Sequence, residues 1–117
     1  MSDRAIILLL QDINEACEHI EQYVRNIDYE YFISNTMVKD AVERNIEIIG
    51  EACNMLPVSF QKSYSYVQWH KPIGMRNRLI HGYFAVDTPM LWNTATVIIP
   101  EFKSQIEKLI NEYSKQY

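Results

Sequence analysis

Between Trp69 and Tyr83 the chain gathers cationic, proton-carrying and hydrogen-bonding side chains more densely than anywhere else. The last eight residues of this segment read Arg-Asn-Arg-Leu-Ile-His-Gly-Tyr, beginning at Arg76. A guanidinium can hold two phosphate oxygens at once, and the imidazole of His81 can move a proton near neutral pH. Together these groups suffice for metal-free attack of a ribose 2′-hydroxyl on its own phosphodiester. The residue types therefore indicate phosphodiester chemistry, with Arg76 and His81 as the candidate catalytic pair.

The spacing of this pair does not place both side chains on one helix face, because residues five apart on a helix point about 140° away from each other. Asn77 and Arg78 lie on the same side as His81, so local geometry leaves Asn77–His81 and Arg78–His81 open as alternative pairs. We include Asn77 and Arg78 as supporting site residues. Arg76 can still converge on the site through its length, through a helix that ends at Gly82, or by meeting the same motif of a second subunit. A two-fold homodimer would place both copies in one cleft.

Charge is unevenly distributed along the chain. The net charge is −4, yet none of the 15 acidic residues lies between Ala52 and Val86, a stretch that contains Lys62, Lys71, Arg76 and Arg78. Such a locally basic region can attract a phosphate chain even in an acidic protein. The plainer alternative is that this acid-free stretch is only a helix-packing and dimer surface.

No other catalytic pattern competes, since the sequence has no glycine-rich phosphate loop, no metal-ligand cluster and no nucleophile elbow. We therefore expect no metal and no cofactor. Cys17 and Cys53 are interpreted as core-filling thiols, and His19, on a glutamate-rich helix face, as a solvated residue. The apolar run over residues 5–10 is too short for a signal peptide or a membrane span, which predicts a cytoplasmic protein without a membrane partner.

Helices must position these residues, because only three glycines and four prolines punctuate the chain. Apolar spacing predicts helices over residues 3–26, 36–55 and 69–81 and from Thr88 onward, with a short helical turn after Pro57. We expect Gly82 to end the third helix in the left-handed conformation. Pro100 interrupts the last helix and predicts a kink near that position.

A hydrophobic content of 48% is enough for one core. The sequence thus predicts a single all-α domain over residues 1–117, an up-and-down bundle of four or five helices. Residues 26–32 crowd aromatic side chains and are interpreted as a connection that packs against the core.

Several blocks beyond the Arg-x4-His-x-Tyr motif resemble the HepT-like branch of the HEPN superfamily. In the family's order they are Ala41-Val42-Glu43-Arg44-Asn45-Ile46-Glu47-Ile48-Ile49-Gly50-Glu51-Ala52, Leu56-Pro57, Trp69, residues 73–87 and Trp92. The resemblance implies an all-α bundle that dimerises. It also implies the toxin of a prokaryotic toxin–antitoxin pair, acting as a metal-independent endoribonuclease on RNA.

By match to the motif, the resemblance implies Arg76 and His81 as the catalytic pair and Asn77 as the polar residue that commonly follows the arginine. Tyr83 would be the tyrosine that an MntA-like nucleotidyltransferase antitoxin adenylylates. AMP on Tyr83 would add bulk and negative charge beside the groups that must receive RNA phosphate. The superfamily also contains members that bind nucleotides or RNA without cutting, so a non-catalytic partner subunit of a nucleotidyltransferase is the alternative.

Overall fold

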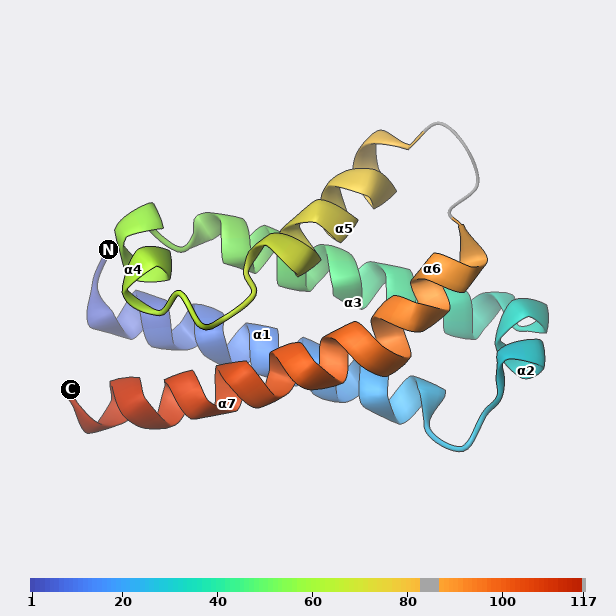
Figure 1. Ribbon diagram of the computed structural model, residues 1–117, viewed down its shortest axis with the longest axis horizontal. Coiled ribbons are helices and arrows are strands. Elements are labelled where there is room, and N and C mark those ends of the chain that lie inside the picture. The colour runs from blue at the N-terminus through green and yellow to red at the C-terminus, as the bar shows by residue number, and fades with distance from the viewer. Residues whose placement is uncertain (83–86, 117) are drawn as a thin grey trace.

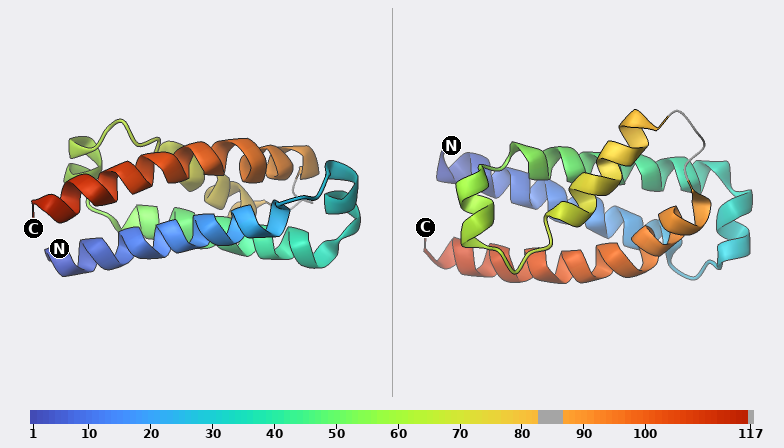
Figure 2. Two further views of the ribbon diagram at one scale, coloured as in Figure 1. Left: turned by 90° about the horizontal axis from the view of Figure 1, so that it is seen from below. Right: turned by 45° about the horizontal axis from the view of Figure 1, so that its top comes forward.

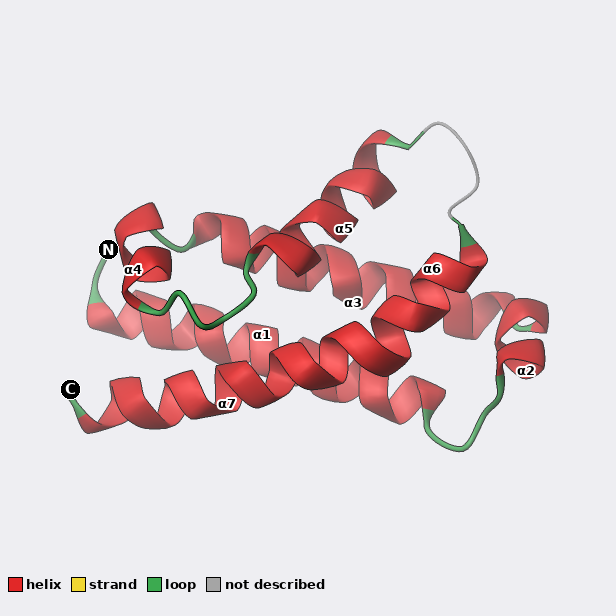
Figure 3. Ribbon diagram, viewed as in Figure 1, coloured by secondary structure: helices red, strands yellow, loops and turns green. Residues whose placement is uncertain are grey.

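The computed structural model describes residues 1–82 and 87–116, and in these ranges the chain consists of helices and loops (Figure 3). The elements are α1 (Asp3–Val24), α2 (Tyr29–Ser34), α3 (Thr36–Met55), α4 (Val58–Ser63), α5 (His70–His81), α6 (Thr88–Asn93), the π-helical turn η1 (Thr94–Ile98) and α7 (Ile99–Lys115). Figure 1 shows α1, α3 and α7 running along the long dimension of the molecule, with both termini at one end. The prediction of an all-α bundle is confirmed.

The core lies between α1, α3 and α7, whose apolar stripes face one another. Ser2 caps the start of α1, because its hydroxyl accepts a hydrogen bond from the Ala5 N–H at 3.1 Å. Fully buried side chains then follow at helical spacing, among them Leu10, Ile13 and Ile20 of α1, Ile46 and Ile49 of α3, and Ile99, Phe102, Ile106 and Leu109 of α7. Among the described residues, no helix is long and apolar enough to cross a membrane.

Residues 26–32 do pack against the core, but they are not a simple connection. The short helix α2 begins inside this segment, where the Asp28 carboxylate caps it by accepting from the Tyr31 N–H at 2.8 Å. Phe32 is fully buried and its ring centroid lies 5.0 Å from that of Trp92. Six residues are too few for an apolar period to show in the sequence, so the cap and the tertiary contact decide the helix.

The irregularity expected near Pro100 takes the form of η1, a turn of π-helix. The Ile99 N–H bonds back to the Thr94 carbonyl, five residues earlier, and Pro100 itself has no N–H to donate. Threonine hydroxyls of this run, those of Thr94 and Thr96, donate to the carbonyls of Met90 and Trp92 at 2.8 and 2.7 Å. Figure 1 shows the helical run changing direction between α6 and α7.

Both cysteines fill the core, as predicted. Cys17 and Cys53 are free thiols with no exposed surface. Burial raises the pKa of the Cys17 thiol to about 12, and it raises the pKa of Cys53 still further. Neither thiol is therefore ionised or reactive in the folded protein near neutral pH.

Candidate active site

The candidate catalytic residues lie on α5, which crosses α3 and extends away from the bundle toward its C-terminal end (Figure 2). Pro72 and Met75 are the buried residues of this helix, whereas Asn77 and His81 are exposed. The expected left-handed end is wrong, because Gly82 has φ −77° and ψ 119° while its N–H bonds to the Arg78 carbonyl at 2.9 Å. The chain leaves α5 in an extended direction, which requires no positive φ.

Gly50 is the residue that lets α5 approach α3. A Cβ added to Gly50 would meet the Pro72 carbonyl oxygen and the Arg76 Cγ at 2.8 Å each, and would overlap the Arg76 Cβ. Only a glycine therefore allows the stem of Arg76 to lie directly against the backbone of α3. Arg76 is half-buried as a result, and its position is fixed by packing before any substrate binds.

The guanidinium of Arg76 carries a charge that no described carboxylate balances. One terminal nitrogen donates to the Asn77 side-chain oxygen at 3.1 Å, and Nε is buried with no hydrogen-bond partner among the described residues. Glu47 of α3 pairs with Arg44 instead, at 3.6 Å. A buried donor without an acceptor is costly, and a phosphate oxygen is the kind of acceptor that suits a guanidinium.

His81 lies in the last turn of α5 and does not join Arg76 within one chain. Among the described residues, no hydrogen bond or ring contact links the two side chains, because a regular α-helix points them to different faces. Asn77 contacts Arg76, while Arg78 lies on the opposite flank and donates from its guanidinium to the Met90 sulfur of α6. Tyr83 lies outside the described residues.

The positive charge of this region is not neutralised by the fold. Within residues 1–82 and 87–116, none of the four cations of the acid-free stretch, Lys62, Lys71, Arg76 and Arg78, forms an ion pair. His81 is exposed at the end of α5, three residues after Arg78. An anionic chain that crosses α5 thus meets cations on both flanks of the helix and a proton-transfer group between them.

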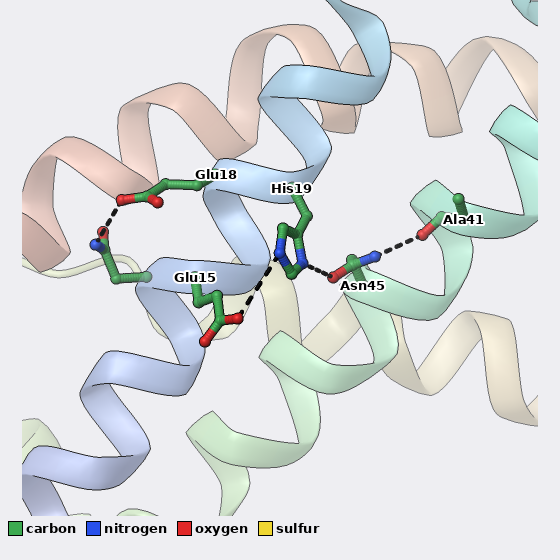
Figure 4. A network of polar contacts seen from close by, with 6 residues as sticks. Glu15, Glu18, His19, Ala41 and Asn45 are labelled. Atoms are coloured by element: carbon green, nitrogen blue, oxygen red, sulfur yellow. Dashed lines mark hydrogen bonds and ion pairs between the residues drawn. The ribbon is translucent and has the colours of Figure 1, made fainter.

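His19 is partly solvated, as its neighbours in sequence predict, since 42% of its side chain is exposed, but it also makes a contact that those neighbours do not indicate. Figure 4 shows its ring reaching from α1 to Asn45 of α3. Asn45 is buried and its amide nitrogen donates to the Ala41 carbonyl at 2.9 Å, so we assign its oxygen as the acceptor for His19 Nδ1 at 3.3 Å. The other ring nitrogen faces Glu15 at 3.8 Å. This contact ties α1 to α3.

The model of the family described as "Ribonuclease HepT-like" matches residues 13–109. The chain belongs to this family. The predicted HepT-like resemblance is thereby confirmed, and the matched residues include all of α5 with Arg76 and His81.

Named relatives of this HepT-like chain carry ribonuclease names. A Methanocaldococcus jannaschii protein named "Putative RNase MJ1216" is 40% identical over 112 residues, which cover 96% of this chain and 93% of the relative. A Thermococcus cleftensis protein named "Probable ribonuclease HepT" is 42% identical over 100 residues, covering 86% of this chain and 91% of the relative. No solved structure matches the chain at a significant level.

Proposed function

We propose that this HepT-like chain is a metal-independent endoribonuclease, the toxin of a toxin–antitoxin pair, and that it acts on RNA in the cytoplasm. The observation that carries the proposal is Arg76, a guanidinium held against Gly50 with a buried, unpartnered Nε and no carboxylate partner among the described residues. The family and the ribonuclease names of the relatives support the same activity.

The reaction follows from the two side chains. The ribose 2′-oxygen attacks the adjacent phosphorus as its proton leaves, and the bond from phosphorus to the 5′-oxygen of the next nucleotide breaks as that oxygen gains a proton. The products are a 2′,3′-cyclic phosphate and a 5′-hydroxyl, so no water and no metal enter the balance. Arg76 stabilises the charge on the non-bridging oxygens, and His81 carries one of the two proton transfers.

The active unit is proposed to be a homodimer, because one chain leaves Arg76 and His81 on different faces of α5. A second copy related by a two-fold axis brings another Arg76 and another His81 to the same cleft. The exposed end of α5 favours this arrangement, since it extends from the bundle with polar side chains at Asn77 and His81.

Regulation is proposed to act on Tyr83, two residues beyond His81 in the sequence. An MntA-like nucleotidyltransferase antitoxin would transfer AMP from ATP to the tyrosine hydroxyl, releasing pyrophosphate. Each AMP adds a negative phosphate close to the cations of α5, which would repel RNA as well as block it. Intact mass after incubation with the cognate partner and ATP should rise by AMP units, and a Tyr83→Phe variant that gains the same mass would refute the assignment.

The activity itself is tested by incubating the purified protein with cellular RNA in EDTA, beside Arg76→Ala, His81→Ala and Lys115→Ala. Lys115 is exposed at the end of α7 and serves as the charge-matched control. We expect wild type and Lys115→Ala to cleave RNA. The cleavage rate of Arg76→Ala and of His81→Ala should be lower by about a hundredfold or more. Equal cleavage by all four proteins would eliminate the site, and binding of RNA without cleavage by any would favour the non-catalytic alternative.

A further inference from the structure

A groove of about 300 Å³ lies between α5 and the α6–η1 run, on the flank of α5 opposite Arg76. Its apolar lining consists of Met75, Met90 and Ile98. The volume falls at the lower end of the range of small-ligand sites, roughly 300–1,000 Å³. Methionine sulfur makes favourable contacts with aromatic rings, so this floor suits a flat ring such as a nucleobase.

Two cations stand on the rim of this groove. Lys71 and Arg78 are seven residues apart on one side of α5, about 10 Å along the helix axis. Neither forms an ion pair with any residue that the structure describes, and Arg78 reaches only the weak sulfur acceptor of Met90. Phosphate oxygens on either side of a bound nucleotide would offer both cations much stronger acceptors.

Gly74 is a glycine inside α5 whose presence the packing of one chain does not explain. A Cβ added to Gly74 would meet no atom of the described residues within 4 Å, unlike the Cβ at Gly50. A glycine inside a helix weakens it, and here no internal packing requires one. Because Gly74 lines the groove, its bare backbone leaves room for a group from outside the chain. The opposite wall includes Thr94 of the π-helical turn, a kind of irregularity that is frequent at functional sites.

We propose that this groove is a subsite for one nucleotide of the RNA, next to the phosphodiester that is cut. The base lies on Met75 and Met90, and its flanking phosphates contact Lys71 and Arg78. The inference rests on the proposed ribonuclease function, to which it adds the place where one nucleotide of the RNA binds. The strand passes His81 at the end of α5 and continues into the groove. None of the described residues that line the groove is acidic, so RNA suits its cations better than a second copy carrying the same cations.

The first test uses a short single-stranded RNA with 2′-O-methyl groups, which binds but lacks the attacking hydroxyl. Methyl NMR of the protein with labelled methionines reports on all five at once. We expect shifts for Met75 and Met90 and none for Met37 and Met55, which are exposed elsewhere on the surface and act as internal controls. Shifts confined to Met37 or Met55 would overturn the groove assignment.

The second test compares Lys71→Ala with the control Lys115→Ala. Lys71 lies in the first turn of α5, where a cation opposes the helix dipole, so its removal should not lower the melting temperature. We expect weaker binding of the 2′-O-methyl RNA and a slope of log Kd against log salt reduced by about 0.7, as for one lost phosphate contact. Unchanged affinity and slope for Lys71→Ala would overturn the proposed contact.

Two further outcomes separate this inference from the function on which it rests. A wild-type protein that cuts RNA, with Met75 and Met90 unshifted by the 2′-O-methyl RNA, removes the subsite and leaves the ribonuclease intact. A wild-type protein that neither binds nor cuts RNA overturns both. The remaining alternative is that the groove is a subunit interface, and sedimentation of a Gly74→Leu variant tests it. Loss of the dimer would identify the groove as an interface and overturn the subsite. An intact dimer with weakened RNA binding supports the subsite.

Discussion

At the scale of single residues, Arg76 combines a fixed stem with a free charge. The stem packs against Gly50, and the guanidinium meets only the neutral amide of Asn77 and no described carboxylate. A carboxylate partner would hold the guanidinium in place but would also compete with phosphate for it. The Asn77 contact orients Arg76 and leaves its net charge available to a substrate.

Asn77 is therefore expected to act as a positioning residue. Asn77→Ala should lower cleavage about tenfold, as the loss of one hydrogen bond to a charged group. Asn77→Asp should lower it further, because a carboxylate would neutralise Arg76. Measured kcat and KM for both variants check this order, with Asn77→Ser as the conservative rescue. An aspartate variant as active as wild type would contradict the role.

The buried thiols predict how stability depends on pH. The pKa of Cys17 is about 12 in the folded protein against 9.0 for a free thiol, because burial disfavours the thiolate. Above about pH 9 the unfolded chain loses protons that the folded chain keeps, so the free energy of unfolding should fall between about pH 9 and pH 12. Urea unfolding at about pH 8 and about pH 10 measures this loss. The double variant Cys17→Ala and Cys53→Ala should show a smaller change, and an equal one would contradict the cause.

Sequence alone identified the residue types at the candidate site but not what holds them. Gly50 was visible as a glycine inside a predicted helix, yet its contact with Arg76 depends on the crossing of two helices that the sequence does not display. The contact of His19 with α3 could not be predicted, for a similar reason. Its neighbours on α1 are glutamates, whereas its partner Asn45 comes from α3, 26 residues away.

At the scale of elements, Gly50 of α3 faces α5 and Gly74 lies on α5 itself. Replacing these two glycines should have opposite effects on stability. Gly50→Ala should lower the free energy of unfolding by about 1–3 kcal/mol, because the added methyl pushes α5 off α3. Gly74→Ala should raise it by about 0.5–1 kcal/mol, because the methyl enters open space and the helix gains a better former. Chemical denaturation of both variants makes the comparison. Equal destabilisation by both would contradict the packing described for α5.

The longer elements were predictable because their apolar spacing repeats over several turns. The helices over α1, α3, α5 and the final run from Thr88 were all expected, and the structure adds their caps at Ser2, Asn35 and Asp87. The short helix α2 and the extended conformation of Gly82 were not predicted. Both depend on where the neighbouring elements lie, and a local pattern does not encode this.

At the scale of the whole molecule, one described chain contains Arg76 and His81 but does not bring the two side chains together. The bundle extends 45 × 31 × 20 Å, and α5 presents its polar end away from the core. We propose that residues 1–117 form one domain whose function is completed by a second copy. One Arg76 and one His81 from different subunits would then form each site.

Mixed dimers test this central claim most directly. Arg76→Ala and His81→Ala chains are co-expressed with two different affinity tags, and the dimer that carries both tags is isolated and incubated with RNA in EDTA. If each site takes its arginine from one subunit and its histidine from the other, one of the two sites in the mixed dimer is intact. We predict about half of the wild-type cleavage rate from the mixed dimer and almost none from either variant alone. A mixed dimer as inactive as its two parents would contradict a shared site.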